Sequence, residues 1–101
     1  MQNFEERVRQ ALDGLPPELA RGLQNVAVVV EDEHAGEPDL LGLFEQEPYM
    51  PAKVTIYRRP LEEHFGHDPG LLEHQIRITV LHELAHYFGI DEDRLAELGY
   101  G

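Results

Sequence analysis

The sequence contains no cysteine, and it has no apolar run near the roughly 20 residues that a membrane-spanning helix needs. Without cysteine, disulfide bonds and thiolate zinc sites are excluded, so any metal ion must be held by histidine, aspartate or glutamate. The first ten residues show no apolar segment behind a basic start, and we find no secretory signal there. We therefore expect a cytoplasmic protein that is not inserted in a membrane.

Basic residues are also scarce, because 8 Lys and Arg stand against 20 Asp and Glu, for a formal net charge of −12. A chain with this charge repels the phosphates of nucleic acids and anionic membrane surfaces, and we expect neither as a partner. The charge is compatible with a basic peptide or protein substrate, although keeping the protein soluble is a sufficient reason for it. The sequence leaves the oligomeric state open.

The length of 101 residues and the 42% hydrophobic content predict one globular domain over residues 1–101. Hydrophobic periodicity, Asn and Asp caps, and prolines at first helical positions locate the helices, and β-branched runs locate the strands. Helices are expected at 3–13, 16–23, 60–66, 69–88 and 91–99, and strands at 25–32, 39–46 and 53–59. The pattern indicates an α+β fold with a small sheet packed on helices.

Two expectations concern how these segments are placed. The strand 25–32 is rich in valine and should be buried, whereas 53–59 is either covered or lies at a sheet edge, where an extended peptide could pair with it. The helix 69–88 should be capped by Asp68 and end at Gly89 in a left-handed conformation.

Within that helix, the sequence HELAHYFGIDE at residues 82–92 combines residue types that suit a metal site. His82 and His86 are four apart, so they lie on one helix face and can both present a nitrogen to one zinc ion. Glu83 is about 100° further round the helix, beside the ion rather than on it. A carboxylate in that place can deprotonate a water molecule bound to the metal.

A catalytic zinc site needs a third protein ligand and an open position for water. A left-handed Gly89 would turn the chain back toward the second histidine and bring Glu92 to the ion, with Asp91 or Asp93 as substitutes. The competing design takes a glutamate from a second helix further along the chain. Glu97 is its only candidate, and little chain remains for it.

The segment HELAHYFGIDE resembles the signature of zincin metallopeptidases, and in its extended form that of the metzincin branch, HExxHxxGxxH/D. The similarity is closer to small bacterial proteins known as minimal metzincin-like zincins, in which a short tail like GIDEDRL (89–95) follows the helix. A weaker resemblance runs through LLGLFEQEP (40–48) and VTIYRRPLEEHFG (54–66), so it covers most of the chain.

The resemblance implies a zincin-like α+β fold, in which a sheet of three or four strands packs on an active-site helix and an N-terminal helix, with zinc below the sheet. It also implies zinc ligands at His82, His86 and the carboxylate ten residues after His82, with Glu83 as general base. The chain departs from the family in two ways. Glu92 stands where His or Asp is more usual, and no methionine follows the motif, since Met50 lies upstream of it.

These observations predict a zinc-dependent metallopeptidase of the metalloendopeptidase type. Glu83 would take a proton from a zinc-bound water as it attacks a peptide carbonyl, and pass it to the leaving amine. One alternative is a non-catalytic binding module stabilised by zinc, which the small size of the chain favours. Another is a zinc hydrolase that acts on a non-peptide amide.

Other residues have weaker claims to a functional role. The acidic loop 31–39 could bind calcium, but it lacks the spaced pattern of a known calcium loop, and a solvated loop is the preferred interpretation. His64 and His67 could bind a second metal, although Gly66 interrupts their helix and surface positions are more usual.

Further candidates lie near the motif or in the third strand. Tyr87 and Tyr100 are candidate oxyanion donors, although a place on the helix surface or in packing is the simpler interpretation for Tyr87. His74 lies two turns before His82 on a roughly similar face and could contact a partner or orient a residue of the site, but simple exposure is the default. The pair Arg58–Arg59 could bind a substrate carboxylate, but balancing nearby acids is the simpler role.

Overall fold

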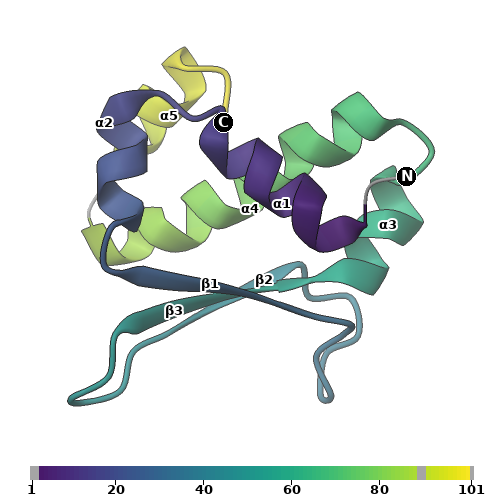
Figure 1. The fold of residues 1–101 in the computed structure, drawn as a ribbon, viewed down its shortest axis with the longest axis horizontal. Helices are drawn as coiled ribbons and strands as arrows, with labels where there is room; N and C mark the ends of the chain where they lie inside the picture. The colour runs from purple at the N-terminus through teal and green to yellow at the C-terminus, as the bar shows by residue number, and fades with distance from the viewer. Residues whose placement is uncertain (1–2, 89–90, 101) are drawn as a thin grey trace.

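The computed structural model describes the backbone of residues 3–88 and 91–100, and the side chains of 3–85 and 91–100. Within these ranges the chain folds into helices and a small mixed sheet (Figure 1). The helices are α1 (Phe4–Asp13), α2 (Pro17–Ala20), α3 (Arg58–Phe65), α4 (Pro69–Phe88) and α5 (Glu92–Glu97), with a 3₁₀ turn η1 (Arg21–Leu23). The strands are β1 (Val26–Glu31), β2 (Gly42–Glu45) and β3 (Ala52–Tyr57). The predicted α+β class is confirmed.

The sheet has the order β1-β3-β2, with β1 parallel and β2 antiparallel to β3. Val54 of the central strand faces Val28 of β1 on one side and Phe44 of β2 on the other. Of the two alternatives for 53–59, the sheet edge is excluded, because β3 is paired on both sides. The expectation of a buried β1 is wrong, since this strand is an edge and its residues are half-buried or exposed.

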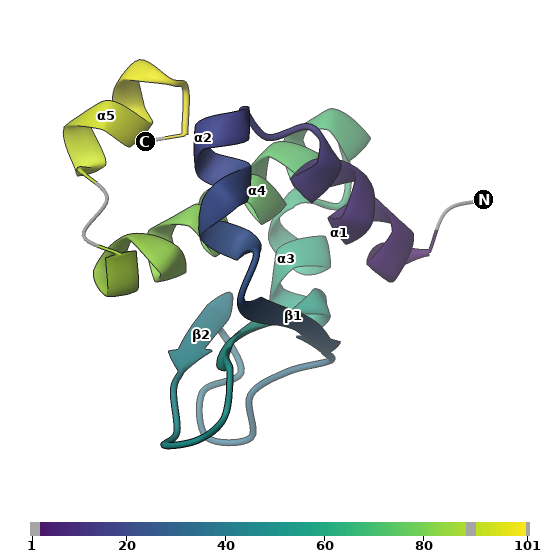
Figure 2. The same ribbon diagram turned by 60° about the vertical axis from the view of Figure 1, so that its left-hand side comes forward.

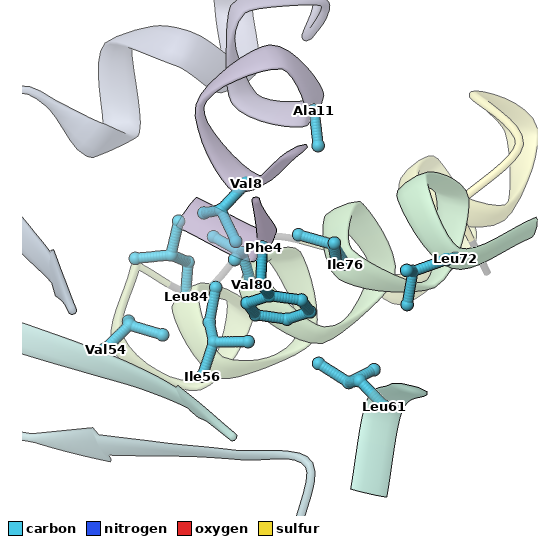
Figure 3. Close-up of a cluster of buried hydrophobic side chains, with 10 residues drawn as sticks. All are labelled: Phe4, Val8, Ala11, Val54, Ile56, Leu61, Leu72, Ile76, Val80 and Leu84. Atoms are coloured by element: carbon cyan, nitrogen blue, oxygen red, sulfur yellow. The ribbon is translucent and has the colours of Figure 1, made fainter. Parts of the chain in front are cut away.

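Helices α1, α3 and α4 cover one face of the sheet, which we call the inner face (Figures 1 and 2). The main core lies between them, where side chains of α1 and α4 meet those of β3 (Figure 3). Its buried members are Phe4, Val8, Ala11, Val54, Ile56, Leu61, Leu72, Ile76, Val80 and Leu84. No helix in the described ranges is both long enough and apolar enough to cross a membrane.

The predicted caps hold the two longest helices. The Oδ1 atom of Asn3 accepts a hydrogen bond from the backbone N–H of Glu6 at 2.8 Å, and α1 begins directly after Asn3, at Phe4. The Oδ1 atom of Asp68 accepts from the backbone N–H of Gly70 at 3.0 Å, and α4 starts at Pro69 as expected. Helix α3 starts at Arg58 rather than Pro60, because the chain turns helical directly after β3.

The helix expected near the C-terminus is also present, as α5. Gly99 ends it with a φ of +90°, its N–H donates to Ala96 O at 3.0 Å, and the Tyr100 N–H donates to Leu95 O at 2.8 Å. This is the Schellman arrangement that a glycine after a helix favours. A second core cluster holds α5 against α2 and α4, with Leu95 only 1% exposed. The expected left-handed Gly89 lies outside the described residues.

Candidate functional site

Helix α4 carries the predicted site residues, and its packing decides which way each of its faces points. One row, Leu72, Ile76, Val80 and Leu84, enters the main core, and Leu81 and Ala85 enter the second cluster. Because these two faces are packed, the remaining positions of the helix are the ones that can meet solvent. Two rows at four-residue spacing run along that side, namely Gln75, Thr79 and Glu83, and Ile78 and His82.

A cleft of about 390 Å³ lies between this side of α4 and the chain that leads into β2, and we call it the α4–β2 cleft. The residues that line it are Asp39, Leu40, Leu41, Gly42, Gln75, Ile78, Thr79, His82 and Glu83. His82 is exposed there and Glu83 is half-buried. The proposed base and the first proposed metal ligand therefore border the same open space, which is a requirement of the predicted chemistry.

Position 86 continues the row of Ile78 and His82 by one further turn of the α4 backbone. The side chains of His86 and Tyr87 lie outside the described residues. The role of His86 as second ligand and that of Tyr87 as oxyanion donor therefore remain predictions from the sequence.

The acidic run after the motif is placed by α5. The Oδ1 atom of Asp91 accepts a hydrogen bond from the backbone N–H of Asp93 at 2.9 Å, so Asp91 is the N-cap of this helix. Glu92 is the first helical residue, and its side chain is exposed, as is that of Asp93. The competing candidate, Glu97, accepts a hydrogen bond from Arg94 at 3.3 Å at the far end of the same helix.

The packing of α5 keeps this run close to α4. Leu95 lies in one cluster with Leu81 and Ala85, which belong to the C-terminal half of α4. On the outer side, Arg94 Nη2 is 2.9 Å from Glu18 Oε1 of α2, and both views show α5 beside α2. The carboxylates of 91–93 are thus carried by an element that is anchored to the helix of the motif.

The donor set at this end of α4 suits zinc, because imidazole nitrogens and carboxylate oxygens are its usual non-thiolate ligands. Among the side chains that the structure describes, no group of three or more histidine, aspartate or glutamate residues is arranged to hold a metal ion. The predicted zinc site includes His86, which falls outside that range. The side chains of the acidic loop 31–39 are within that range, and they form no such group.

The pair Arg58–Arg59 balances the acidic loop, as the simpler interpretation predicted. Arg58 Nε donates to Asp32 Oδ1 at 3.0 Å, and its Nη1 donates to Glu62 Oε1 at 2.8 Å. These two bonds, with Glu62 first, raise the pKa of the Arg58 guanidinium above its ordinary value. Arg59 Nη1 lies 3.7 Å from Glu33 Oε1. Both guanidinium groups are therefore used within the protein rather than aimed at the cleft.

The structure separates His74 and Tyr100 from the α4–β2 cleft. Their rings stack on each other with centroids 6.0 Å apart, and Tyr100 packs against the second cluster of α2, α4 and α5. Neither residue is among the described side chains that line the cleft. The expectation that Tyr100 or His74 serves the same site as Glu83 is therefore not supported.

The cleft also contains Asp39, Gln75 and Thr79, which were not predicted from the sequence. A signal existed for two of them, since Gln75, Thr79 and Glu83 repeat at intervals of four and had to share one helix face. Asp39 had no such signal, because it reaches the cleft only through the pairing of β2 with β3.

Comparison with known families identifies a match over most of the chain. A family model described as zincin-like metallopeptidase matches residues 23–101, which include the sheet, α4 and α5 but leave out α1 and α2. A comparison with curated proteins found no match.

Proposed function

Because the chain belongs to the zincin-like metallopeptidase family, we propose that it is a zinc-dependent peptidase whose catalytic base is Glu83. The observation that carries the proposal is the shared position of His82 and Glu83 on the α4–β2 cleft. An exposed imidazole can receive a metal ion, and a half-buried carboxylate one residue later is held beside it. This pairing is what hydrolysis by a metal-activated water requires.

We assign the zinc ligands to His82, His86 and Glu92. The hydrogen bond from Asp93 N–H to the Asp91 carboxylate supports Glu92 over Asp91, because Asp91 is already used as a helix cap. Asp93 is the remaining substitute, since it is exposed in the first turn of α5. When bound, zinc supplies a Lewis acid that lowers the pKa of water toward about 7 and polarises a carbonyl oxygen.

In this mechanism Glu83 carries the proton. Its carboxylate accepts a proton from water as the water oxygen attacks the peptide carbonyl carbon. It then donates that proton to the amine nitrogen as the C–N bond breaks. The close approach of Gly42 to this side of α4, where a β-carbon would lie 3.5 Å from Glu83 Cγ, supports a carboxylate whose stem is held by packing.

The substrate is proposed to be an extended peptide that lies along β2. This strand is an edge of the sheet and borders the cleft, which is the place where an added peptide strand would lie in β-augmentation. It takes the place of β3, which the sequence had suggested for this role and which the structure places at the centre of the sheet.

Asp39 supports a preference for a basic substrate side chain. It is exposed and lines the same cleft as Glu83. A carboxylate there can pair with the charged tip of a lysine or arginine side chain of the substrate. The replacement Asp39→Asn should lower kcat/KM for basic peptides about tenfold relative to neutral ones.

The experiment that tests the function measures zinc and cleavage together. Protein purified without added metal is analysed for its metal content and then incubated with a peptide library. We expect about one zinc per chain and cleavage by the wild type, zinc without cleavage for Glu83→Gln, and loss of zinc for His82→Ala. The matched control is Glu73→Gln, which makes the same change on α4 outside the cleft and should leave both readouts unchanged.

Two results would count against the proposal. Full activity of Glu83→Gln would remove that residue from the mechanism. A wild type that holds zinc but cleaves no peptide would favour the alternatives, which are a zinc-stabilised binding module or a hydrolase of non-peptide amides.

A further inference from the structure

The outer side of β1 is an open strand edge. Strand β1 pairs with β3 on one side only, and within the described residues no backbone hydrogen bond reaches its other side. Its sequence, VAVVVE, is dominated by β-branched residues and contains no proline or lysine. Such an edge is a template for pairing with another strand, and soluble proteins usually block it or cover it.

A groove of about 510 Å³ runs along this open edge beneath α1. Its floor is formed by Val28, Val29 and Val30, and its wall by one face of α1. The residues of that face recur at helical spacing, namely Glu5, Val8, Arg9 and Leu12. The groove therefore combines apolar surface with a free backbone edge, and each half of it alone would be unusual on an isolated monomer.

The two edges of the sheet differ in a way that separates their roles. Strand β2 has four residues, ends in Glu45 and borders the α4–β2 cleft, while β1 has six residues and lies on the side of α1 (Figure 2). A short edge strand with a charged end is protected against unwanted pairing. Strand β1 also ends in a glutamate, Glu31, but it is longer, and Val26–Val30 carry no charge.

We propose that a second copy of this chain covers the β1 edge, by antiparallel pairing of β1 with β1 about a two-fold axis. In an antiparallel pair about a two-fold axis, the residue on the axis lies opposite the same residue of the partner subunit, and this residue sets the pairing register. With Val28 on the axis, Glu31 faces Asn25 of the partner subunit. With Val29 on the axis, Glu31 faces Ala27 of the partner subunit. Either register avoids like charges opposite each other.

Charge on α1 favours a second copy over an unrelated strand. Pairing the two edges joins the two grooves, and the two α1 helices then face each other in antiparallel directions across the axis. Glu5 and Arg9, which are one turn apart on the groove face, are exposed and have no ion pair within the described part of the chain. In the two-fold arrangement, Glu5 meets Arg9 of the partner subunit and Arg9 meets Glu5 of the partner subunit.

The pairing has a consequence for the proposed active site. It would produce a continuous six-stranded sheet with β2 at both outer edges, so that both α4–β2 cleft regions stay open to substrate. Strand β1 lies within the residues that match the family model, and helix α1 lies outside them. The dimer does not depend on whether the protein is a peptidase.

Sedimentation equilibrium of the full chain over about 1–200 µM tests the proposal. We expect the wild type to dimerise. Arg9→Glu or Glu5→Arg should raise the dimer dissociation constant at least about tenfold. Each substitution puts like charges at positions 5 and 9 opposite each other, and the two-fold axis repeats that repulsive pair. The double variant Glu5→Arg with Arg9→Glu restores opposite charges and should dimerise like the wild type. The controls Arg7→Glu and Glu6→Arg make equal charge changes on α1 away from the groove and should have little effect.

Hydrogen exchange on the same samples locates the interface. The amides of 26–31 should exchange more slowly in the wild-type dimer than in monomeric Arg9→Glu, while those of 42–45 stay unchanged. Circular dichroism spectra and melting curves establish that each variant is folded. A wild type that is monomeric throughout the range overturns the proposal and leaves the edge to an extended segment of another protein. A dimer whose dissociation constant is unchanged by both single charge reversals also overturns the proposal. So does a dimer in which the amides of 42–45, and not those of 26–31, exchange more slowly.

Discussion

Gly42 of β2 lies against Thr79 of α4 so closely that a β-carbon on Gly42 would be 2.7 Å from the Thr79 Cγ2 atom. The same β-carbon would be 3.3 Å from the Thr55 carbonyl oxygen. A contact of 2.7 Å essentially never occurs at a real β-carbon, so a larger residue at position 42 would require β2 or Thr79 to shift. The width of the proposed active-site cleft is therefore controlled by the absence of one side chain.

The variant Gly42→Ala should push β2 away from α4. We expect a loss of about 1–3 kcal/mol in the free energy of unfolding, the usual cost of overpacking. Peptidase activity should fall by more than the unfolded fraction explains, because β2 borders the site of Glu83. Urea unfolding and the specific activity of the folded fraction measure the two effects.

A second substitution tests whether the clash is the cause. Thr79→Ser removes Cγ2 but keeps the Oγ atom that donates to Gln75 O at 2.8 Å. The double variant Gly42→Ala with Thr79→Ser should recover most of the lost stability. Additive losses in the double variant would contradict this explanation.

Tyr49 in the β2–β3 connection has a φ of 67°, and its side chain is fully exposed. A residue with a β-carbon pays about 1–2 kcal/mol for this left-handed conformation, whereas glycine adopts it freely. Tyr49→Gly should therefore raise the free energy of unfolding by about 1 kcal/mol, or the melting temperature by about 5 °C. Tyr49→Ala removes the same ring but keeps the strain, so equal gains in both variants would show that strain is not responsible.

Leu95 is 1% exposed and anchors α5, which carries the proposed third ligand Glu92. Leu95→Ala should cost about 2–5 kcal/mol in the free energy of unfolding and weaken zinc binding, since it loosens the element that presents the carboxylate. Arg94→Ala removes only the exposed ion pair with Glu18 and should cost at most about 1 kcal/mol. Denaturant unfolding with and without a zinc chelator compares the two variants. Unchanged zinc affinity in Leu95→Ala would argue against Glu92 as the third zinc ligand.

The buried phenol of Tyr57 should make the free energy of unfolding fall at alkaline pH. Burial of its side chain raises the pKa of the phenol above its usual value, and the charges of Glu31 and Glu45 raise it further. The folded state thus keeps a proton that the unfolded state loses near pH 10. Stability from this group is complete below about pH 10 and is lost as the pH rises through the folded-state pKa.

Urea unfolding between pH 9 and 11 measures that loss. Tyr57→Phe has no phenol to ionise, so its stability should fall less steeply over this range than that of the wild type. Tyr49→Phe is the matched control, because its phenol is exposed in the folded state. Parallel curves for the wild type and Tyr57→Phe would contradict the assignment.

Features that depend on near neighbours in the chain could be predicted from the sequence. Asp68 as cap and Pro69 as first residue located α4 correctly, and Asn3 did the same for α1. The closing of the last helix at Gly99 followed from one glycine after a short helical pattern. In each case the deciding hydrogen bonds join residues at most five positions apart, so local composition was enough.

The errors concern contacts between distant segments. The runs 25–32 and 53–59 are both rich in β-branched residues, and nothing in either run shows which one has two neighbours. The order β1-β3-β2 results from β2 crossing to the far side of β3, which also brings Asp39 to α4. Arg58 belongs to α3 rather than to the expected strand, and its guanidinium is bound there by Asp32, from a distant segment, and by Glu62.

The amino-acid sequence by itself determined the long helix of the motif, its capped start and the one-turn spacing that places positions 82 and 86 on one face beside Glu83. The tertiary structure decided that β2 rather than β3 borders this face, that Asp39 lies in the same cleft, and that β1 is left with an open edge. The physical reason is that helical neighbours are fixed by four-residue hydrogen bonding, whereas strand neighbours are chosen by packing between segments such as Val28 and Val54, which lie far apart in the chain.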